Sequence, residues 1–221
     1  MKSLNQYIQE KLIINKDYRD GKMYHPESFD ELRKIIEDRY DKLGAGTEQN
    51  PIDFNDIDVS NINSFCDNKY NSNVKGIFEY MRFKYIDISD WDVSNIESMR
   101  HMFYHCEKLE SAGDISKWDV SKVNSMSCMF YYCKELKSVG DISKWDVSNV
   151  KSMTFMFSEC KKFNQDISNW NVSNVEDMSY MFDWCESFNQ DISSWDVSNV
   201  IFKDSIFDNC PIKNKYKPKF K

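Results

Sequence analysis

The chain has 221 residues, of which 41% are hydrophobic and 15% aromatic, so it can bury a core in one or two domains. Its formal net charge of −7 argues against a general nucleic-acid-binding protein, because neutralising phosphates requires a basic surface. No run of 18 apolar residues occurs, so we expect neither a transmembrane helix nor a membrane partner.

Residues 1–55 predict a helical N-terminal cap or docking module. Leu4, Tyr7, Ile8 and Leu12 recur at helical spacing. This opening lacks the apolar middle region of a secretory signal peptide and has no lipobox cysteine near its start. We therefore expect a cytoplasmic or virion-associated protein.

A second helix is predicted after the tetrapeptide Ser-Phe-Asp-Glu at residues 28–31. This tetrapeptide has the form of a capping box, in which the first and last side chains each satisfy an unpaired backbone amide. Apolar residues in 32–43 mark one face, and Gly44 suits the end of a helix. Residues 44–55 are rich in Gly, Thr, Asn and Pro and are predicted to form a linker.

Residues 56–210 contain an internal repeat built on the sequence Trp-Asp-Val-Ser-Asn-Val. The repeat returns every 25 to 27 residues, and a cysteine follows each tryptophan by fifteen positions. A fixed period of this length is typical of a solenoid, in which each repeat stacks on its neighbours. The tryptophans are Trp91, Trp118, Trp145, Trp170 and Trp195, and the cysteines are Cys106, Cys133, Cys160, Cys185 and Cys210.

Each repeat contains three recognisable segments. Asp-Ile-Ser-x-Trp and Val-x-x-Met have the character of short strands, whereas Met-Phe-x-x-Cys is typical of a tight helical turn. Stacking would pair the strands in parallel and bury columns of Met, Phe, Cys, Ile and Val. Each large buried side chain contributes roughly 1.5–3 kcal/mol, which is enough to hold a stack but not one isolated repeat.

The long pattern Phe-Asn-Gln-Asp-Ile-Ser-x-Trp-x-Val-Ser-Asn-Val-x-x-Met-x-x-Met-Phe-x-x-Cys resembles the 25-residue repeat of bacterial and Mycoplasma surface proteins, relatives of the BspA-like leucine-rich repeats. The resemblance covers residues 56–210 and is close at 163–185 and 188–200. With the predicted N-terminal helices, it implies an α/β fold: a leucine-rich-repeat-like solenoid of short parallel strands and helical turns, with an N-terminal α-helical cap. It also implies a role in adhesion or protein interaction. Separately, residues 1–16 are similar to the openings of proteins from phages of gut Bacteroidales.

The cysteine and aspartate columns have both chemical and structural interpretations. One cysteine per repeat predicts reduced core residues rather than disulfide partners. The sequence contains no CxxC motif, so a metal site is not predicted. The aspartates could bind calcium, but Asp and Ser at turns more often accept backbone hydrogen bonds. His101 and His105 lack an evident third ligand and are interpreted as surface residues. No metal or other cofactor is therefore expected.

Functional residues are expected where the repeats differ. The sequence has no Walker loop, GxGxxG or HExxH motif, which predicts a protein that is not an enzyme. Variable positions around the Met-Phe pair are unusually aromatic, and exposed aromatics mark interaction patches, although such rings can also be tucked between coils. The candidate partner-binding residues are Tyr104, His105, Tyr131, Tyr132, Phe155, Tyr180 and Trp184.

The leading functional hypothesis is a non-enzymatic protein–protein interaction solenoid with a protein partner that the sequence does not identify. The alternatives are a structural or virion-packaged phage component, and a carbohydrate-binding adhesin that uses the stacked tryptophans. The sequence leaves the oligomeric state open. Residues 211–221 are predicted to form a basic C-terminal tail, extended and solvated, because lysines alternate with other residues from 213 onward. Such a tail is either a solubilising end or a docking segment for an acidic partner.

Overall fold

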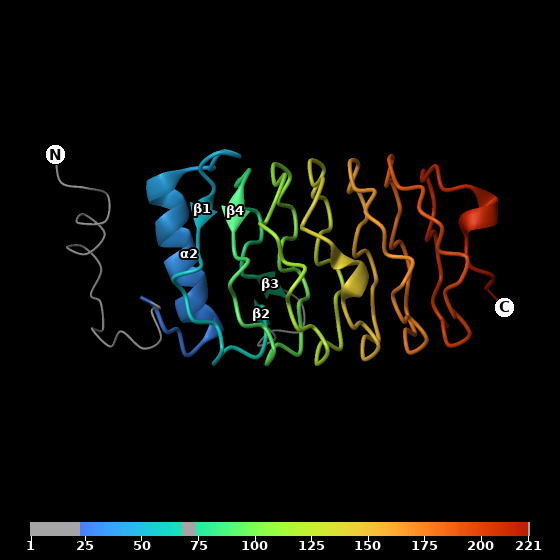
Figure 1. Ribbon diagram of the computed structural model, residues 1–221, viewed down its shortest axis with the longest axis horizontal. Coiled ribbons are helices and arrows are strands. Elements are labelled where there is room, and N and C mark those ends of the chain that lie inside the picture. The colour runs from blue at the N-terminus through green and yellow to red at the C-terminus, as the bar shows by residue number, and fades with distance from the viewer. Residues whose placement is uncertain (1–22, 68–73, 221) are drawn as a thin grey trace.

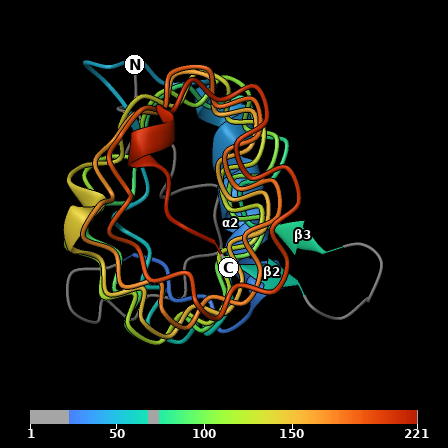
Figure 2. The same cartoon turned by 90° about the vertical axis from the view of Figure 1, so that its right-hand side faces the viewer.

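The backbone forms a row of coils that lie side by side along the long axis of the molecule (Figure 1). The computed structural model describes residues 23–67 and 74–220, so the helix expected around residues 4–12 lies outside the described residues. Helix α2 (Phe29–Leu43) lies at one end of the row and the C-terminal coil at the other. Viewed along the row, the coils superpose into one closed outline (Figure 2).

Regular strands are short and lie in the first coils. Strand β1 (Ile52–Asp53) pairs in parallel with β4 (Ile86–Asp87), with Ile52 opposite Ile86, and β2 (Cys66–Asp67) pairs antiparallel with β3 (Lys75–Gly76). Later coils are joined by isolated parallel bridges, one between each pair of neighbouring coils at the same repeat position. This position lies inside the Val-x-x-Met segment, where the sequence predicts a short strand. The bridged residues are Ser64, Ser98, Ser125, Ser152, Asp177 and Phe202 in succession. Two short 3₁₀ helices span Ile142–Lys144 and Asn214–Tyr216.

The Met-Phe-x-x-Cys segments are consecutive tight turns, so the helical turn expected there is wrong. The Met129 amide donates to the Met126 carbonyl at 3.1 Å, and the Cys133 amide donates to the Phe130 carbonyl at 3.0 Å. A residue with positive φ precedes Met129 and another precedes Cys133, which stops helical propagation. Backbone amides that do not close these turns donate to the next coil, as Phe130 does to the Met156 carbonyl at 3.0 Å.

Stacked apolar columns fill the interior. The Phe103, Phe130, Phe157 and Phe182 rings are fully buried and stack with centroid separations of 5.3, 5.7 and 5.8 Å. Each ring therefore contacts its counterparts in the coils before and after it, so the core of each repeat is completed by its neighbours.

The tryptophan column also belongs to the interior. The five Trp side chains are 3–6% exposed. Their indole N–H groups donate to main-chain carbonyls of the preceding coil, as Trp145 Nε1 does to the Ile115 oxygen at 3.1 Å. The proposed carbohydrate-binding strip of tryptophans is therefore wrong, because neither the ring faces nor the N–H donors are accessible.

The cysteine column is buried and reduced. Cys106, Cys133, Cys160 and Cys185 are free thiols with at most 1% exposure, as the sequence predicts. Each Sγ lies 2.8–3.1 Å from the main-chain oxygen of a buried Phe in the preceding coil. Burial raises the pKa of these four thiols well above the usual range. The column therefore packs as a set of small apolar residues with a weak donor.

The aspartate columns form turns. Aspartate Oδ1 accepts the amide of the serine two residues later, for example from Ser116 to Asp114 at 3.1 Å and from Ser121 to Asp119 at 3.0 Å. Asn171 makes the same contact with Ser173 at 3.2 Å, so a neutral amide oxygen can also fill the acceptor position of this turn. The turn interpretation is confirmed, because these carboxylates are occupied by backbone hydrogen bonds.

Helix α2 covers the N-terminal end of the row. The Ser28 Oγ accepts the Glu31 amide at 3.2 Å, and Gly44 follows the helix with φ of 76°, both as predicted. The Glu31 carboxylate returns to the Glu27 amide at 2.9 Å instead of the Ser28 amide. Arg39 forms a bidentate pair with Asp56 at 2.7 and 3.0 Å, which fixes the helix to the first coil.

The C-terminal segment packs against the last coils, so the expectation of a solvated tail is wrong. Ile212 and Pro218 are buried, and the Tyr216 carbonyl accepts the Ile192 amide at 3.0 Å. The lysines remain at the surface while the apolar residues between them turn inward. The segment therefore covers part of the C-terminal end of the stack.

Candidate interaction surface

Every coil from the His101 coil onward contains two residues in the left-handed region, four positions apart. In one coil they are Cys128 and Tyr132, with φ of 57° and 65°, and in the next they are Phe155 and Glu159, with φ of 55° and 62°. Side chains at these positions and at the position after each core Phe gather on one edge of the row. We call this set the aromatic strip, and its members are Tyr80, His101, Tyr104, His105, Tyr131, Tyr132, Phe155, Tyr180 and Trp184.

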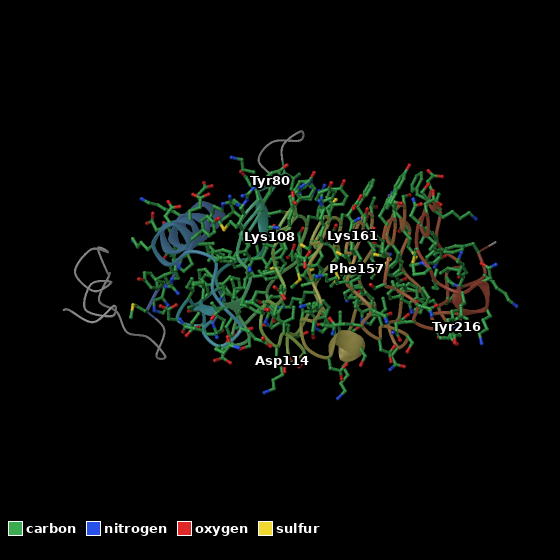
Figure 3. All side chains as sticks on the ribbon, turned by 90° about the horizontal axis from the view of Figure 1, so that it is seen from above. Tyr80, Lys108, Asp114, Phe157, Lys161 and Tyr216 are labelled. Atoms are coloured by element: carbon green, nitrogen blue, oxygen red, sulfur yellow. The ribbon has the colours of Figure 1, made fainter. Side chains whose placement is uncertain are left out.

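The edge that carries Tyr80 is opposite the edge that carries Asp114, and the core Phe157 lies between them (Figure 3). The coil architecture produces this separation, because the Asp-Ile-Ser turns and the Met-Phe turns lie on opposite sides of each coil. The strip thus belongs to one side of the molecule, where β3 also lies (Figure 2).

Ring contacts join eight members of the strip into one continuous set. Tyr104 stacks on Tyr131 at 5.1 Å, Tyr131 meets the edge of Phe155 at 5.6 Å, and Phe155 stacks on Tyr180 at 4.6 Å. A second row begins at Tyr80, whose centroid lies 5.1 Å from that of His105, which in turn stacks on Tyr132 at 4.4 Å. Trp184 continues the second row in a later coil. Six of the seven residues chosen from the sequence are therefore in mutual contact.

The rings of the strip are accessible to solvent and are also held by contacts with neighbouring rings. Tyr80 is 62% exposed and Trp184 is 43% exposed, whereas the other members are half-buried. The rings are thus neither sealed between coils nor free to rotate away from the surface. Tyr80 was missed from the sequence because its coil is degenerate, although it follows Phe78 by two residues as His105 follows Phe103.

Placing aromatic residues at left-handed positions costs stability. A residue with a Cβ loses roughly 1–2 kcal/mol in this region, and Asn pays less because its short side chain hydrogen-bonds locally. The last coil has Ser205 and Asn209 at the two positions, with φ of 50° and 54°. The turn therefore does not require aromatic rings, and their presence in the other coils has a reason other than backbone conformation.

Charges flank the strip unevenly. The Lys134 ammonium lies 4.1 Å from the Tyr132 centroid, and the Lys161 ammonium lies 5.7 Å from that of Trp184. Near the C-terminal end, burial and the Asp208 charge raise the pKa of Asp183. The carboxylates of Asp183 and Asp208 thus lie at the same end of the strip as the Lys161 ammonium.

His101 and His105 are both members of the strip, and the sequence itself selects His105 as a candidate partner-binding residue. Both are half-buried, and desolvation lowers the pKa of each ring. The His101 Nδ1 atom lies 3.0 Å from the Val74 carbonyl. The two imidazoles are therefore largely neutral at pH 7 and act as aromatic surfaces.

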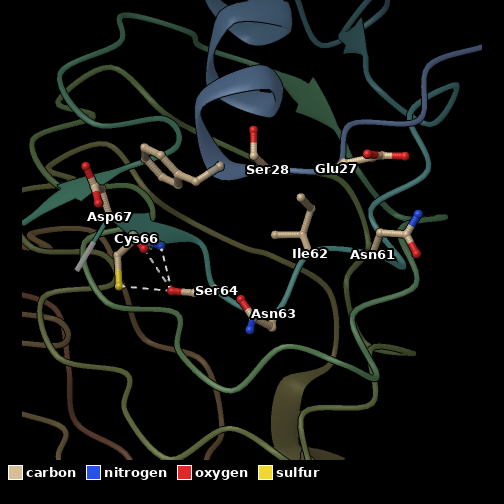
Figure 4. A pocket seen from close by; sticks show the side chains of 9 residues that line it. Glu27, Ser28, Asn61, Ile62, Asn63, Ser64, Cys66 and Asp67 are labelled. Carbon is tan, nitrogen blue, oxygen red and sulfur yellow. Dashed lines mark hydrogen bonds between the residues drawn. The ribbon is translucent and has the colours of Figure 1, made fainter. Parts of the chain in front are cut away.

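A separate pocket of about 410 Å3 lies between the start of α2 and residues 61–67 (Figure 4). Ser64 and Cys66 share its wall, but the Ser64 Oγ is occupied by the Cys66 carbonyl at 2.9 Å. Among residues 23–67 and 74–220, no group of three or more His, Cys, Asp or Glu is placed to hold a metal ion. No helix in that part of the chain is long and apolar enough to cross a membrane.

Comparison with curated proteins and with solved structures finds no significant match. No finding supports the resemblance of the first residues to phage proteins. One family profile does match, twice, over residues 51–141 and 110–220, and these two matches span the row of coils. The chain therefore belongs to the family described as Mycoplasma protein of unknown function, DUF285.

Proposed function

We propose that this chain is a non-enzymatic protein-binding repeat protein that presents the aromatic strip to a polypeptide partner. We further propose that its coils form a leucine-rich-repeat-like solenoid related to the BspA-like repeats. Support comes from the parallel bridges between successive coils and from the family match over residues 51–220.

The observation that carries the proposal is the placement of rings at left-handed positions that Asn and Ser fill in the last coil. Any residue with a Cβ costs backbone stability at these positions, so the backbone gives no reason to prefer a ring there, whereas contact area in a binding surface does. Tyr and Trp provide large, rigid contact areas with few rotatable bonds, which is why they dominate interface energetics.

The ionisable groups of the strip are poor catalysts, which favours binding over chemistry. Burial raises the pKa of Tyr104, a member of the strip, to about 12, and it also raises to about 12 the pKa of Cys128, which occupies a left-handed position between the strip residues. Both groups stay protonated at neutral pH and supply no nucleophile.

The test is capture of a partner by tagged protein in extracts of the native source, followed by mass spectrometry. The double variant Tyr132→Asn/Trp184→Asn keeps residues suited to left-handed backbone, as Asn209 shows, and should lose the partner. Phe202→Ala, which removes a 56% exposed ring from the bridge column, should retain it. Equal capture by the double variant and the wild-type protein would refute the proposal.

A further inference from the structure

We propose that copies of this chain associate end to end, with the last coil of one copy docked against the outer face of helix α2 of the next. The contact joins two different surfaces at opposite ends of the long axis (Figure 1). A contact between unlike surfaces at the two ends of a row does not close a dimer, so we expect open assemblies that grow with concentration. Neither surface includes a member of the aromatic strip, so the inference goes beyond the proposed function.

The wall of each coil that contains the Met-Phe turns is polar along the row. The amides of Tyr180, Phe182 and Trp184, for example, donate to carbonyls of the following coil at 2.8–2.9 Å. The same bonds join earlier coils, as from the Tyr132 amide to the Ser158 carbonyl at 2.9 Å. The backbone donors of this wall therefore point toward the C-terminal end of the row, and the carbonyls that pair with them point toward the N-terminal end.

The last coil has no coil after it, so the donors of its wall are open. Ser205, Phe207 and Asn209 are the counterparts of the three donors in the preceding coil, and within the described residues their amides donate to no acceptor. The Lys217 ammonium lies 5.3 Å from the centroid of the Phe207 ring and adds a full positive charge beside this row. Aligned amides next to an ammonium favour carboxylate oxygens as partners.

Charge is distributed unevenly between this end and the rest of the chain. Residues 201–220 contain five lysines and two aspartates, whereas the whole chain has a net charge of −7. Two last coils placed face to face would bring donors against donors and lysines against lysines. The partner surface is therefore a different and acidic one.

Helix α2 covers the opposite end of the same wall with a basic side chain. The Arg33 Nη2 atom donates to the Glu79 carbonyl at 3.4 Å. Glu79 is the counterpart of Tyr104 in the next coil, whose carbonyl accepts the Tyr80 amide at 2.9 Å. Arg33 therefore takes the place of a preceding coil at the acceptor end of the wall. The view along the row shows α2 on the same side of the outline as β3 (Figure 2).

The outer face of α2 is acidic. Across the ion pair of Arg33 with Glu37, the arginine side chain is 21% exposed and the glutamate side chain is 51% exposed, so the base lies inward and the acid outward. Asp41 follows Glu37 by four residues and thus shares its face of the helix. Acids outnumber lysines among the exposed charged residues of 27–43, which are Glu27, Asp30, Glu31, Lys34, Glu37, Asp41 and Lys42.

The two ends match after a simple shift along the long axis. Because α2 covers the acceptor end of the wall, the shift brings its outer face opposite the donor end of the same wall in the neighbouring copy. Carboxylates such as those of Glu37 and Asp41 then accept from the open amides and pair with Lys217 and Lys219. These pairs form at a partly exposed interface, so salt weakens them.

Sedimentation velocity of the full chain tests the inference. Between about 10 μM and about 1 mM protein at low ionic strength, the average mass should rise past that of a dimer, and about 0.5 M salt should return it to that of a monomer. The control variant Glu97→Lys/Glu176→Lys changes the net charge on exposed positions of coils between the two ends, and it should assemble as the unaltered chain does.

Charge reversal separates the two surfaces. Glu37→Lys/Asp41→Lys alters α2, and Lys217→Glu/Lys219→Glu alters the C-terminal end; each should weaken association at least about tenfold. An equimolar mixture of the two variants should restore assembly. The unaltered C-terminal end of the first then meets the unaltered α2 of the second, and the two altered surfaces are again opposite in charge. Melting curves establish that each variant is folded.

A monomer at every concentration would overturn the inference, as would a mass that stops at the dimer. Association of the α2 variant alone at the level of the unaltered chain would show a contact between two C-terminal ends and would also overturn it. Two folded variants whose mixture stays monomeric would have the same consequence. The concentration and salt series use the unaltered chain, so they test the inference even where a variant fails to fold.

Discussion

Replacing Phe157 by alanine tests whether the stacked phenylalanine column holds the coils together. The ring is fully buried, stacks on Phe130 and Phe182 at 5.7 and 5.8 Å, and lies 4.1 Å from the Phe163 ring. A buried aromatic side chain removes at least about 150 Å2 from water, worth roughly 4 kcal/mol at about 25 cal/mol per Å2. The retained methylene lowers this value and the cavity raises it, so we expect a loss of about 3–5 kcal/mol in unfolding free energy.

The cavity should persist because both neighbouring coils are held by the backbone ladder, in which Phe157 itself donates to the Met181 carbonyl at 3.0 Å. Urea unfolding followed by tryptophan fluorescence measures the loss, since Trp170 lies 6.3 Å from the Phe157 ring. The control is Phe202→Ala at a 56% exposed ring, which should cost no more than about 0.5 kcal/mol. A Phe157→Ala loss under about 1 kcal/mol would show that the column does not carry the stability of the stack.

Thiol titration at pH 8 should label Cys106, Cys133, Cys160 and Cys185 only after unfolding, because burial raises their pKa and the thiolate is the reactive form; rapid labelling of the native protein would contradict the buried column. Deleting residues 212–220 should lower the melting temperature by several degrees, because Ile212 and Pro218 are buried and Tyr216 accepts the Ile192 amide; an unchanged temperature would mean that the segment contributes nothing to the end of the stack. Serine hydroxyl and amide donors lower the pKa of Asp119, Asp141 and Asp191 in the folded state, so their stabilising effect is present above about pH 4 and is lost as pH falls through the lowered values. The melting temperature should therefore fall as the pH is lowered from about 5 to about 3. Asp119→Asn should weaken that dependence, because Asn171 already fills the equivalent position in another coil. An identical pH profile in the variant would refute the assignment of the acid sensitivity to these carboxylates.

Much of the fold could be predicted from the sequence because equivalent positions in successive repeats lie in the same environment, so the same residue type recurs there. The Phe, Met and Cys columns are apolar in coil after coil, so their burial could be predicted without any single position being decisive. Helix α2 carried its own start and stop signals in Ser28 and Gly44.

The local turn geometry could not be predicted, because its residues give misleading signals. Left-handed positions are normally identified by Gly or Asn, whereas here they hold residues such as Cys128, Phe155 and Trp184. Because no Gly or Asn interrupts it, the segment Met-Phe-x-x-Cys also has the apolar spacing of a helical turn. The strip could nevertheless be located, since the same positions vary most between repeats.

Two further errors have a common physical cause. A large ring that is polar at one end favours a glycan-binding surface for the tryptophan column, yet the indole N–H of each of its five members donates to a carbonyl in the preceding coil. The C-terminal segment was considered solvated because of its lysines, yet Ile212 and Pro218 between them are buried. In both places the burial depends on contacts with other coils, which the local sequence does not reveal.

Site-specific photocrosslinking tests the central claim most directly. A photoreactive phenylalanine analogue replaces Tyr80 in one protein and Lys117 in another; Lys117 is exposed and follows Asp114, a residue of the opposite edge, by three positions. Irradiation in extracts of the native source should yield a discrete crosslinked polypeptide from position 80 and none from position 117, and Tyr132→Asn/Trp184→Asn should abolish that crosslink. A discrete product from position 117 alone, or a position-80 product that survives the double substitution, would contradict the assignment of the aromatic strip as the binding surface.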